Sequence, residues 1–164
     1  MSIYLFLKGH YRKIMLKAAL ITLFTAMIPV VELRGAIPAG TAAGLEPWEA
    51  FILACIGNMI PVPFIILFAR RLLIVLRRKY KKLNNFILSI QNRAKDKAQI
   101  VRDYEMAGLI LLVAIPLPGT GAWTGALVAA IMKLDLKYAV ASIGIGVFIA
   151  GCIVMGLTYG VIAI

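Results

Sequence analysis

The four longest stretches without a charged residue dominate the pattern of hydrophobic and polar positions along the chain. They are residues 18–31, 50–69, 106–132 and 138–164. A helix needs about 20 apolar residues to cross the hydrocarbon core of a bilayer, and only the first stretch is shorter than that. The pattern therefore predicts an all-α, polytopic integral membrane protein that passes through the cell membrane several times.

Composition and charge agree with a membrane protein and indicate its polar partners. Hydrophobic residues make up 62% of the chain, charged residues 15%, and the mean hydropathy is +0.94, outside the range of soluble domains. The net charge of +11 comes from basic residues concentrated within 8–17 and 70–102. Both segments flank apolar stretches, which favours membrane lipid headgroups on the cytoplasmic side and not nucleic acid.

The residues typical of metal centres and common enzymes do not form a pattern. Cys55 and Cys152 both lie in apolar stretches without metal-ligand spacing, and His10 stands alone in the basic N-terminal segment. The sequence also lacks a Walker A loop and a GxSxG elbow. We therefore expect no catalytic residues, no metal and no other cofactor.

Two segments rich in proline and glycine predict an internal repeat. AIPAGTAAG at 36–44 has a counterpart in AIPLPGTGAWTG at 114–125, and polar junctions follow them, LEPWEAF at 45–51 and LDLKYAV at 134–140. A long apolar span comes after each junction. We expect two repeats, each made of a broken or re-entrant helical hairpin followed by a transmembrane helix.

We expect the two repeats to form a single membrane domain that covers residues 1–164. Its parts are a basic N-terminal tail at 1–17, a first repeat at 18–79, a linker at 80–105 and a second repeat at 106–164. Apolar residues recur in the linker at helical spacing, at Leu83, Phe86, Ile87, Ile90, Ala94 and Val101. This spacing predicts an amphipathic helix at the cytoplasmic surface; a solvated helix or one that contacts a second copy fits the same pattern.

Broken helices in duplicated halves are a recurring plan of secondary transporters, whose binding site lies near the midplane between the breaks. Irregular backbone is tolerated at that depth only where protein or a water-filled cavity surrounds it. The candidate residues of a substrate or proton site are Glu32, Arg34, Gly35, Pro38, Asn58, Pro116, Pro118, Gly119, Thr120, Gly121, Trp123 and Thr124.

Three of these motifs carry a resemblance to a known family. VELRGAIPAG at 31–40, GNMIPVPF at 57–64 and AIPLPGTGAWTGA at 114–126 resemble the small multi-drug export family, over about residues 31–160. The two-half pattern is more distantly similar to the DedA superfamily. That similarity implies two re-entrant hairpins and transport of lipids or lipid phosphates. DedA proteins carry an arginine in the second hairpin motif, whereas residues 116–125 are uncharged here.

Glu32 and Arg34 are the only charged residues between Lys17 and Glu46. A charge at the centre of a transmembrane helix costs about 2.5–3.5 kcal/mol on insertion scales, so such residues usually pair or face water. We expect Glu32 to exchange a proton, and Arg34 to attract an anionic headgroup or to steady the carboxylate. The alternative is that the two residues only close the tip of the hairpin.

The other candidates supply backbone breaks and hydrogen-bonding groups. Pro38, Pro116, Pro118, Gly119 and Gly121 are expected to set the breaks and to free amides that hold an anion. The hydroxyls of Thr120 and Thr124 either donate to a substrate or bond their own helix. Trp123 either stacks on a substrate or anchors the chain at the membrane interface. Asn58 is expected to bond a neighbouring helix, with a ligand contact as the alternative.

Two topologies remain open from the sequence. Four single crossings would keep both basic segments inside, whereas two re-entrant hairpins place the N-terminal tail outside. The expected function is a secondary exporter, with or without proton coupling, or a lipid or lipid-phosphate translocase; the alternative is a non-transporting assembly factor or scaffold. Because one chain is too small to enclose a large substrate, we expect a homodimer or a higher oligomer.

Overall fold

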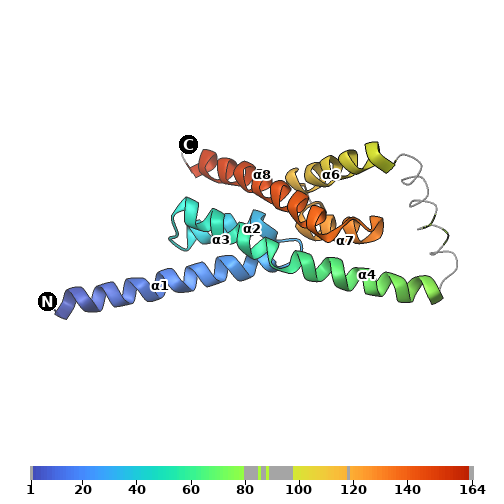
Figure 1. Cartoon of the computed structure of the whole chain (residues 1–164). Coiled ribbons are helices and arrows are strands. Elements are labelled where there is room, and N and C mark those ends of the chain that lie inside the picture. Colours follow the sequence, from blue (N-terminus) through green and yellow to red (C-terminus); the bar gives the residue numbers. More distant parts are fainter. Residues whose placement is uncertain (1, 80–84, 86–87, 89–97, 118, 163–164) are drawn as a thin grey trace. The chain divides into compact units, whose positions relative to one another are not determined.

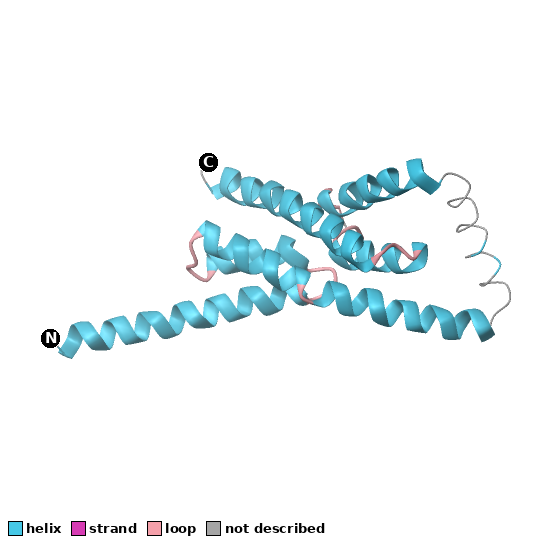
Figure 2. Ribbon diagram, in the orientation of Figure 1, coloured by secondary structure: helices cyan, strands magenta, loops and turns pink. Residues whose placement is uncertain are grey.

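A computed structural model describes residues 2–79, 85, 88, 98–117 and 119–162 (Figure 1). Its helices are α1 (Ser2–Met27), α2 (Glu32–Ala42), α3 (Pro47–Met59), α4 (Pro61–Lys79), α6 (Ala98–Ala114), α7 (Ala122–Met132) and α8 (Leu136–Ile162). No strand occurs among these residues, and short loops join the consecutive helices from α1 to α4 and from α6 to α8 (Figure 2). The all-α prediction is confirmed for the described chain.

The chain divides into two compact units. The first contains Met1–Asn58 and Gly151–Ile164, and the second contains Met59–Ala150. The long helix α8 therefore contributes its N-terminal part to the second unit and its C-terminal part to the first. Each unit is built around a hairpin in which a long helix is followed by one of 11 residues, α2 or α7.

In the first unit, α2 folds back onto α1 because small residues let the two backbones approach closely. A Cβ atom on Gly40 would lie 2.5 Å from Oγ1 of Thr22. Thr22 is buried and donates its hydroxyl proton to the Ala18 carbonyl at 2.8 Å, so it leaves no polar group unpaired at this contact. The substitution of a larger residue for Gly40 would separate the helices.

Two further helical segments complete the first unit. α3 packs on α1 where Gly57 faces the backbone carbonyl of Leu23. The C-terminal part of α8 packs on α3, where a Cβ atom on Gly151 would lie 2.6 Å from the ring of Phe51. Glycine is the contact residue in each case, as expected for helices that pack closely in a membrane.

The second unit uses the same kind of contact. A Cβ atom on Gly125 of α7 would lie 2.6 Å from the side chain of Val113 in α6. A Cβ atom on Gly146 of α8 would lie 2.7 Å from Val113 and 2.9 Å from the carbonyl oxygen of Ile110, also in α6. α4 packs against α7, and the guanidinium of Arg70 donates to the carbonyl of Leu134 just after α7.

The positions of the two Ala-Ile-Pro motifs correct one prediction. Pro38 was expected to break the first hairpin, but α2 continues through it. The chain reverses at residues 28–31 instead, where Val30 has φ 75° and Glu32 has φ 47°. Ala36, Ile37 and Pro38 thus lie inside a helix, whereas Ala114 ends α6 and Pro116 lies in the following loop.

A proline within a helix removes one hydrogen-bond donor, and membrane helices tolerate this where neighbouring groups compensate. In the last turn of α2, the Thr41 side chain bonds the backbone. Its hydroxyl lies 2.9 Å from the Pro38 carbonyl and 3.1 Å from the Ile37 carbonyl. The reversal at residues 28–31 is made by the positive φ angles of Val30 and Glu32. These residues carry no sequence signal for such a turn, so the break was assigned too late in the chain.

The polar junctions after the short helices end those helices in the same way. Leu45 N–H donates to the Gly40 carbonyl at 3.0 Å, and Leu134 N–H donates to the Ala129 carbonyl at 3.1 Å. The residue before each leucine has positive φ, Gly44 at 94° and Lys133 at 59°. Both ends are Schellman motifs, in which a left-handed residue lets the next amide reach back five residues.

The helices that follow the two junctions, α3 and α8, begin with equivalent hydrogen bonds. Ala50 N–H donates to the Glu46 carbonyl at 2.9 Å, and Ala139 N–H donates to the Asp135 carbonyl at 2.9 Å. An acidic residue therefore stands at the start of α3 and of α8, where it is favoured by the helix dipole. The correspondence between LEPWEAF and LDLKYAV holds at the level of these hydrogen bonds.

By length and composition, Pro47–Leu76 and Leu136–Gly160 could each cross a membrane. The first of these contains the bend at Ile60 between α3 and α4. Large apolar side chains are widely exposed on the helices, with Phe64 at 69% and Phe68 at 70%. Most of the predicted linker helix at 80–105 lies outside the described residues; its last part, from Ala98, belongs to α6.

Candidate functional site

The tip of the first hairpin holds the charged pair that the sequence singled out. Glu32 is the first residue of α2, only 4% exposed, and has a left-handed φ of 47°. Its N–H donates to the Ile28 carbonyl at 3.0 Å, which closes the turn from α1. The structure therefore places a carboxylate in a buried turn, in a conformation that residues with a side chain rarely adopt.

Arg34 and Gly35 follow within the first turn of α2. Arg34 is half-buried. Gly35 N–H donates to the Val31 carbonyl at 3.1 Å, and a Cβ atom on Gly35 would lie 2.5 Å from Cγ1 of Val31. Gly35 thus leaves space for the Val31 side chain and does not break the helix. Pro38 lies one turn further along α2 and is half-buried.

Asn58 lies in the same unit, near the end of α3. Its side chain is fully buried, at 0% exposure, and neither Oδ1 nor Nδ2 has a hydrogen-bond partner within the described part of the chain. The expected hydrogen bond to a neighbouring helix is therefore not formed there. Burial of an amide group without a hydrogen-bond partner costs on the order of 2–7 kcal/mol. Asn58 is therefore the clearest unsatisfied polar group among the described residues of this unit.

The second hairpin has an uncharged tip held by threonine hydroxyls. The hydroxyl of Thr120 lies 2.7 Å from the Ile115 carbonyl and 2.8 Å from the Leu117 carbonyl, and it accepts from the Leu117 N–H at 3.2 Å. Thr124 donates its hydroxyl proton to the Gly119 carbonyl at 2.9 Å. Both hydroxyls thus bond the backbone of their own loop, which is the structural one of the two roles considered for them.

The glycines of this tip take the conformations that the turn requires. Gly119 has φ 84° and Gly121, which precedes α7, has φ 124°. Pro116 lies in the loop and is half-buried, as is Trp123 in the first turn of α7. Pro118 lies outside the described residues. Pro116, Gly119 and Gly121 thus lie between the end of α6 and the start of α7.

The structure thus gathers the candidates into two groups. Glu32, Arg34 and Gly35 lie together at the first tip, and Pro116, Gly119, Thr120, Gly121, Trp123 and Thr124 lie at or next to the second. Each group belongs to one unit. The described residues contain no cluster of three or more His, Cys, Asp or Glu side chains that could hold a metal ion.

Two polar side chains of the second unit, Ser142 and Arg70, were not among the candidates from the sequence. Ser142 of α8 is at 0% exposure, and its hydroxyl has no partner in the described chain, although Thr22 and Thr158 bond the carbonyl four residues back. Arg70 of α4 bonds the junction after α7 through its guanidinium. Ser142 lies within an apolar stretch of the sequence and Arg70 directly follows one. A polar residue at such a position is the sequence signal that could have identified them.

A comparison of the sequence with models of known protein families finds one match. The family model described as "Putative small multi-drug export protein" matches residues 32–153. The chain belongs to this family. Searches of curated proteins and of solved structures returned no match.

The match to the small multi-drug export family begins at Glu32, directly after the turn at residues 28–31, and extends into α8, so it includes all the candidate residues. The name of the family denotes export, which is transport in general terms. Together with the two segments that are long and apolar enough to cross a membrane, it indicates a membrane protein.

Proposed function

We propose that this member of the small multi-drug export family is a secondary exporter in the cell membrane, and that Glu32 is its proton-exchanging group. The supporting observation is the combination of burial and positive φ at this one residue. A left-handed conformation costs a residue with a side chain roughly 1–2 kcal/mol. A charge in the membrane interior costs about 2.5–3.5 kcal/mol more on insertion scales. Glycine would avoid both costs, so the carboxylate is best explained by a function.

The proposal includes a repeat with a corrected register. Among the described residues, the six with positive φ fall into pairs 89 residues apart: 30 and 119, 32 and 121, 44 and 133. The buried positions of α2, at Leu33, Ala36, Ile37 and Gly40, have the same spacing as buried Ala122, Gly125, Ala126 and Ala129 of α7. This agreement supports two copies of one hairpin, matched through their turns and junctions and not through the Ala-Ile-Pro motifs.

Both hairpins are re-entrant in this proposal. A helix of 11 residues, such as α2 or α7, is about 16 Å long at about 1.5 Å per residue. The hydrocarbon core is about 30 Å thick, so neither short helix can cross it. A hairpin with such a leg brings its tip to the interior of the membrane, where broken helices of secondary transporters form their sites.

The two tips offer different chemistry to a substrate. The first provides Glu32 and Arg34, and the second provides the uncharged N-terminal end of α7 after Gly121. Arg34 is the group in the first tip that would attract an anionic substrate, and it is the feature that favours a lipid phosphate as an alternative cargo. Since a single chain is small for such a cargo, we also propose a homodimer or higher oligomer.

Transport in proteoliposomes tests the proposal. The purified protein would be reconstituted alone, and uptake of a radiolabelled lipophilic cation and movement of a fluorescent phospholipid would be measured with an imposed pH gradient between pH 5 and pH 8. Glu32→Gln keeps the shape of the side chain and removes its titration, so pH-driven transport should fall to the level of empty liposomes. Glu46→Gln, at the exposed junction, is the matched control and should transport normally.

The results also separate the alternatives. If only the phospholipid moves, and Arg34→Lys slows it, the protein is a lipid translocase, because lysine keeps the charge but loses the planar, bidentate guanidinium. If Glu32→Gln inserts normally and transports both probes at the wild-type rate at every pH, Glu32 only closes the hairpin. If the wild-type protein moves neither probe, the scaffold alternative replaces the transporter.

A further inference from the structure

The two cysteines of the chain are brought to one helix contact in the first unit. Cys55 belongs to α3 and Cys152 to the C-terminal part of α8. The two helices meet at Gly151, where a Cβ atom would lie 3.3 Å from Sγ of Cys55. Cys152 is the next residue of α8, and the two thiols are close enough to interact electrostatically. Packing thus pairs two thiols that are far apart along the sequence.

The two thiols differ in how a compound can reach them. Neither forms a disulfide; Cys55 is half-buried and Cys152 is exposed. An exposed atom on an apolar helix of a membrane protein faces lipid, so a compound dissolved in the bilayer meets Cys152 first. Cys55 then stands behind it as a second sulfur.

The surroundings of the pair favour ligands that leave it uncharged. Cys55 lies within residues 50–69 and Cys152 within residues 138–164, both without a charged residue. The ring of Phe51 lies at the same helix contact. A charge in an apolar environment is costly. Two thiols that give up their protons to a monovalent soft metal such as Cu(I) would form a complex with one negative charge.

Zinc would form a neutral complex with two thiolates, but its coordination does not fit this pair. Structural zinc sites in proteins have four ligands. The part of the chain that the structure describes contains no cluster of three or more His, Cys, Asp or Glu side chains. The pair therefore suits a thiophilic atom that needs only two sulfur ligands and loses all its charge to them.

We propose that Cys55 and Cys152 together bind trivalent arsenicals that carry one organic group. With an arsine oxide the reaction is R–As=O + 2 R′–SH → R–As(S–R′)2 + H2O. Each sulfur forms a bond to arsenic, the arsenic–oxygen bond breaks, and the oxygen leaves as water with both thiol protons. Arsenic stays trivalent, and the product is neutral. Thiolates are soft ligands, which such an atom prefers.

The second bond distinguishes a thiol pair from a single reactive cysteine. After one sulfur has bonded, the other reacts within the same molecule, at an effective concentration of roughly millimolar or higher. A small monothiol has to replace two linked bonds one at a time, whereas a small dithiol replaces both at once. The bound arsenical should therefore resist a monothiol and be removed by a dithiol.

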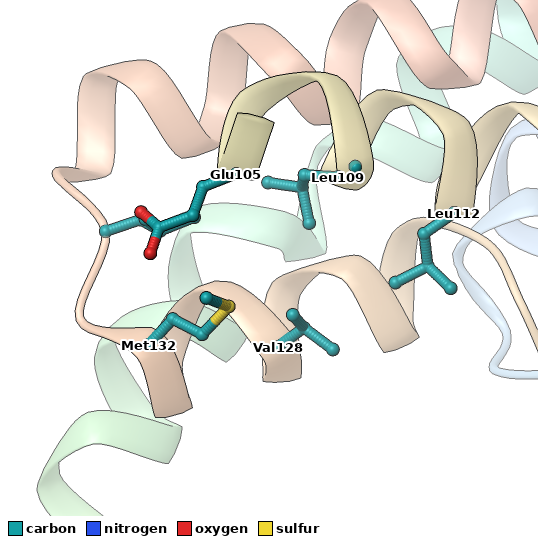
Figure 3. Close-up of a pocket in the computed structure, with 7 residues that line it drawn as sticks. Glu105, Leu109, Leu112, Val128 and Met132 are labelled. Atoms are coloured by element: carbon teal, nitrogen blue, oxygen red, sulfur yellow. The ribbon is translucent and has the colours of Figure 1, made fainter. Parts of the chain in front are cut away.

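A lipophilic arsenical can also enter an apolar groove without reacting. One such groove lies between α6 and α7, with Leu109 and Leu112 on one side and Val128 and Met132 on the other (Figure 3). Another lies between α1 and α3 in the first unit. No cysteine lines either groove. A compound held there is lost when the protein unfolds, whereas one bonded to sulfur remains.

Mass spectrometry of the denatured protein separates these cases. The reduced protein, purified in detergent, would be treated with phenylarsine oxide in excess 2-mercaptoethanol before denaturation. We expect one phenylarsenic group per chain, with the loss of two hydrogen atoms, and its complete removal by 2,3-dimercaptopropanol. Cys55→Ser and Cys152→Ser should each lower the occupancy at least tenfold.

A double variant that keeps two thiols is the matched control. Cys152→Ser combined with Ile153→Cys moves the second sulfur by one residue along α8. At about 100° per residue, position 153 lies about 200° around the helix from Gly151 and so points away from α3. Its occupancy should fall as far as that of the single variants. Cys55→Ala and Cys152→Ala replace the serine variants if a hydroxyl at either position prevents purification.

Three results would overturn the proposal. Removal of the wild-type adduct by 2-mercaptoethanol would show a single bond to arsenic. Retention of the adduct by Cys152→Ser or by the double variant would show that the two native thiols are not paired. A mass equal to two chains and one phenylarsenic group would place the second sulfur on another copy. The assay needs no transport, so its outcome is independent of the proposed export function.

Discussion

Glu32 and Gly121 both stand at the start of an 11-residue helix with a positive φ, 47° and 124°. Glycine adopts such angles without steric cost, whereas glutamate does not. The first hairpin therefore has a strained residue where the second has an unstrained one. Strain of this kind is concentrated at functional sites, where the surrounding structure holds it in place.

This difference predicts how stability changes at position 32. Glu32→Gly should melt at a higher temperature than Glu32→Gln, since both remove the carboxylate but only glycine relieves the backbone. The expected difference is about 1 kcal/mol. Thermal unfolding of the two variants in the same detergent would measure it. A glycine variant that is less stable than the glutamine variant would show that Glu32 is not strained.

The Schellman motifs give a pair of opposite predictions. Gly44→Ala places a side chain at φ 94°, and Lys133→Gly removes one at φ 59°. The first change should destabilise the protein and the second should stabilise it, each by about 1 kcal/mol. Lys137→Gly, within α8, is the control for the second change, and it should destabilise because glycine weakens a helix. Changes of the same sign at 44 and 133 would contradict the shared motif.

The sequence predicted the all-α class and the polar junctions, because these depend on runs of apolar residues and on the charged residues between them. It gave residues 1–17 only as a basic tail, whereas α1 begins at Ser2. The loop containing Pro116, Gly119 and Gly121 was also predicted, since each of these residues has a backbone preference that suits a turn. The turn at Val30 and Glu32 was not. Neither residue favours positive φ, so the neighbouring Pro38 was taken as the break, and the two halves were aligned through the wrong motif.

The sequence also could not predict which polar side chains are buried without a hydrogen-bond partner. Asn58 and Ser142 are visible as polar residues within apolar stretches, but only the packing shows that both are fully buried and lack partners in the described chain.

Pro38 tests the corrected position of the first break. If it lies inside α2, Pro38→Ala restores an N–H that can donate to the Arg34 carbonyl four residues back. Proline in a helix interior is about 3 kcal/mol less favourable than alanine, so the variant should be more stable by up to about that amount. Pro116→Ala, in the loop of the second tip, restores no helical bond and should gain much less. A loss of stability in Pro38→Ala would support a break at Pro38 after all.

Gly57 and Gly146 make the strongest prediction about packing, because each faces a backbone carbonyl that cannot rotate away. In the first unit the carbonyl belongs to Leu23 of α1, and in the second to Ile110 of α6. A methyl group at either position must push two helices apart. Overpacking of this kind typically costs about 1–3 kcal/mol.

Gly57→Ala and Gly146→Ala should therefore each lower the free energy of unfolding by at least about 1 kcal/mol, measured by denaturant titration in mixed micelles. Gly156→Ala is the control, since a Cβ atom there meets nothing within 4 Å. It should stabilise α8 by up to about 1 kcal/mol through helix propensity alone. If alanine is tolerated at 57 but not at 146, the helices of the first unit are not packed as described, and the shared glycine contact is limited to the second unit.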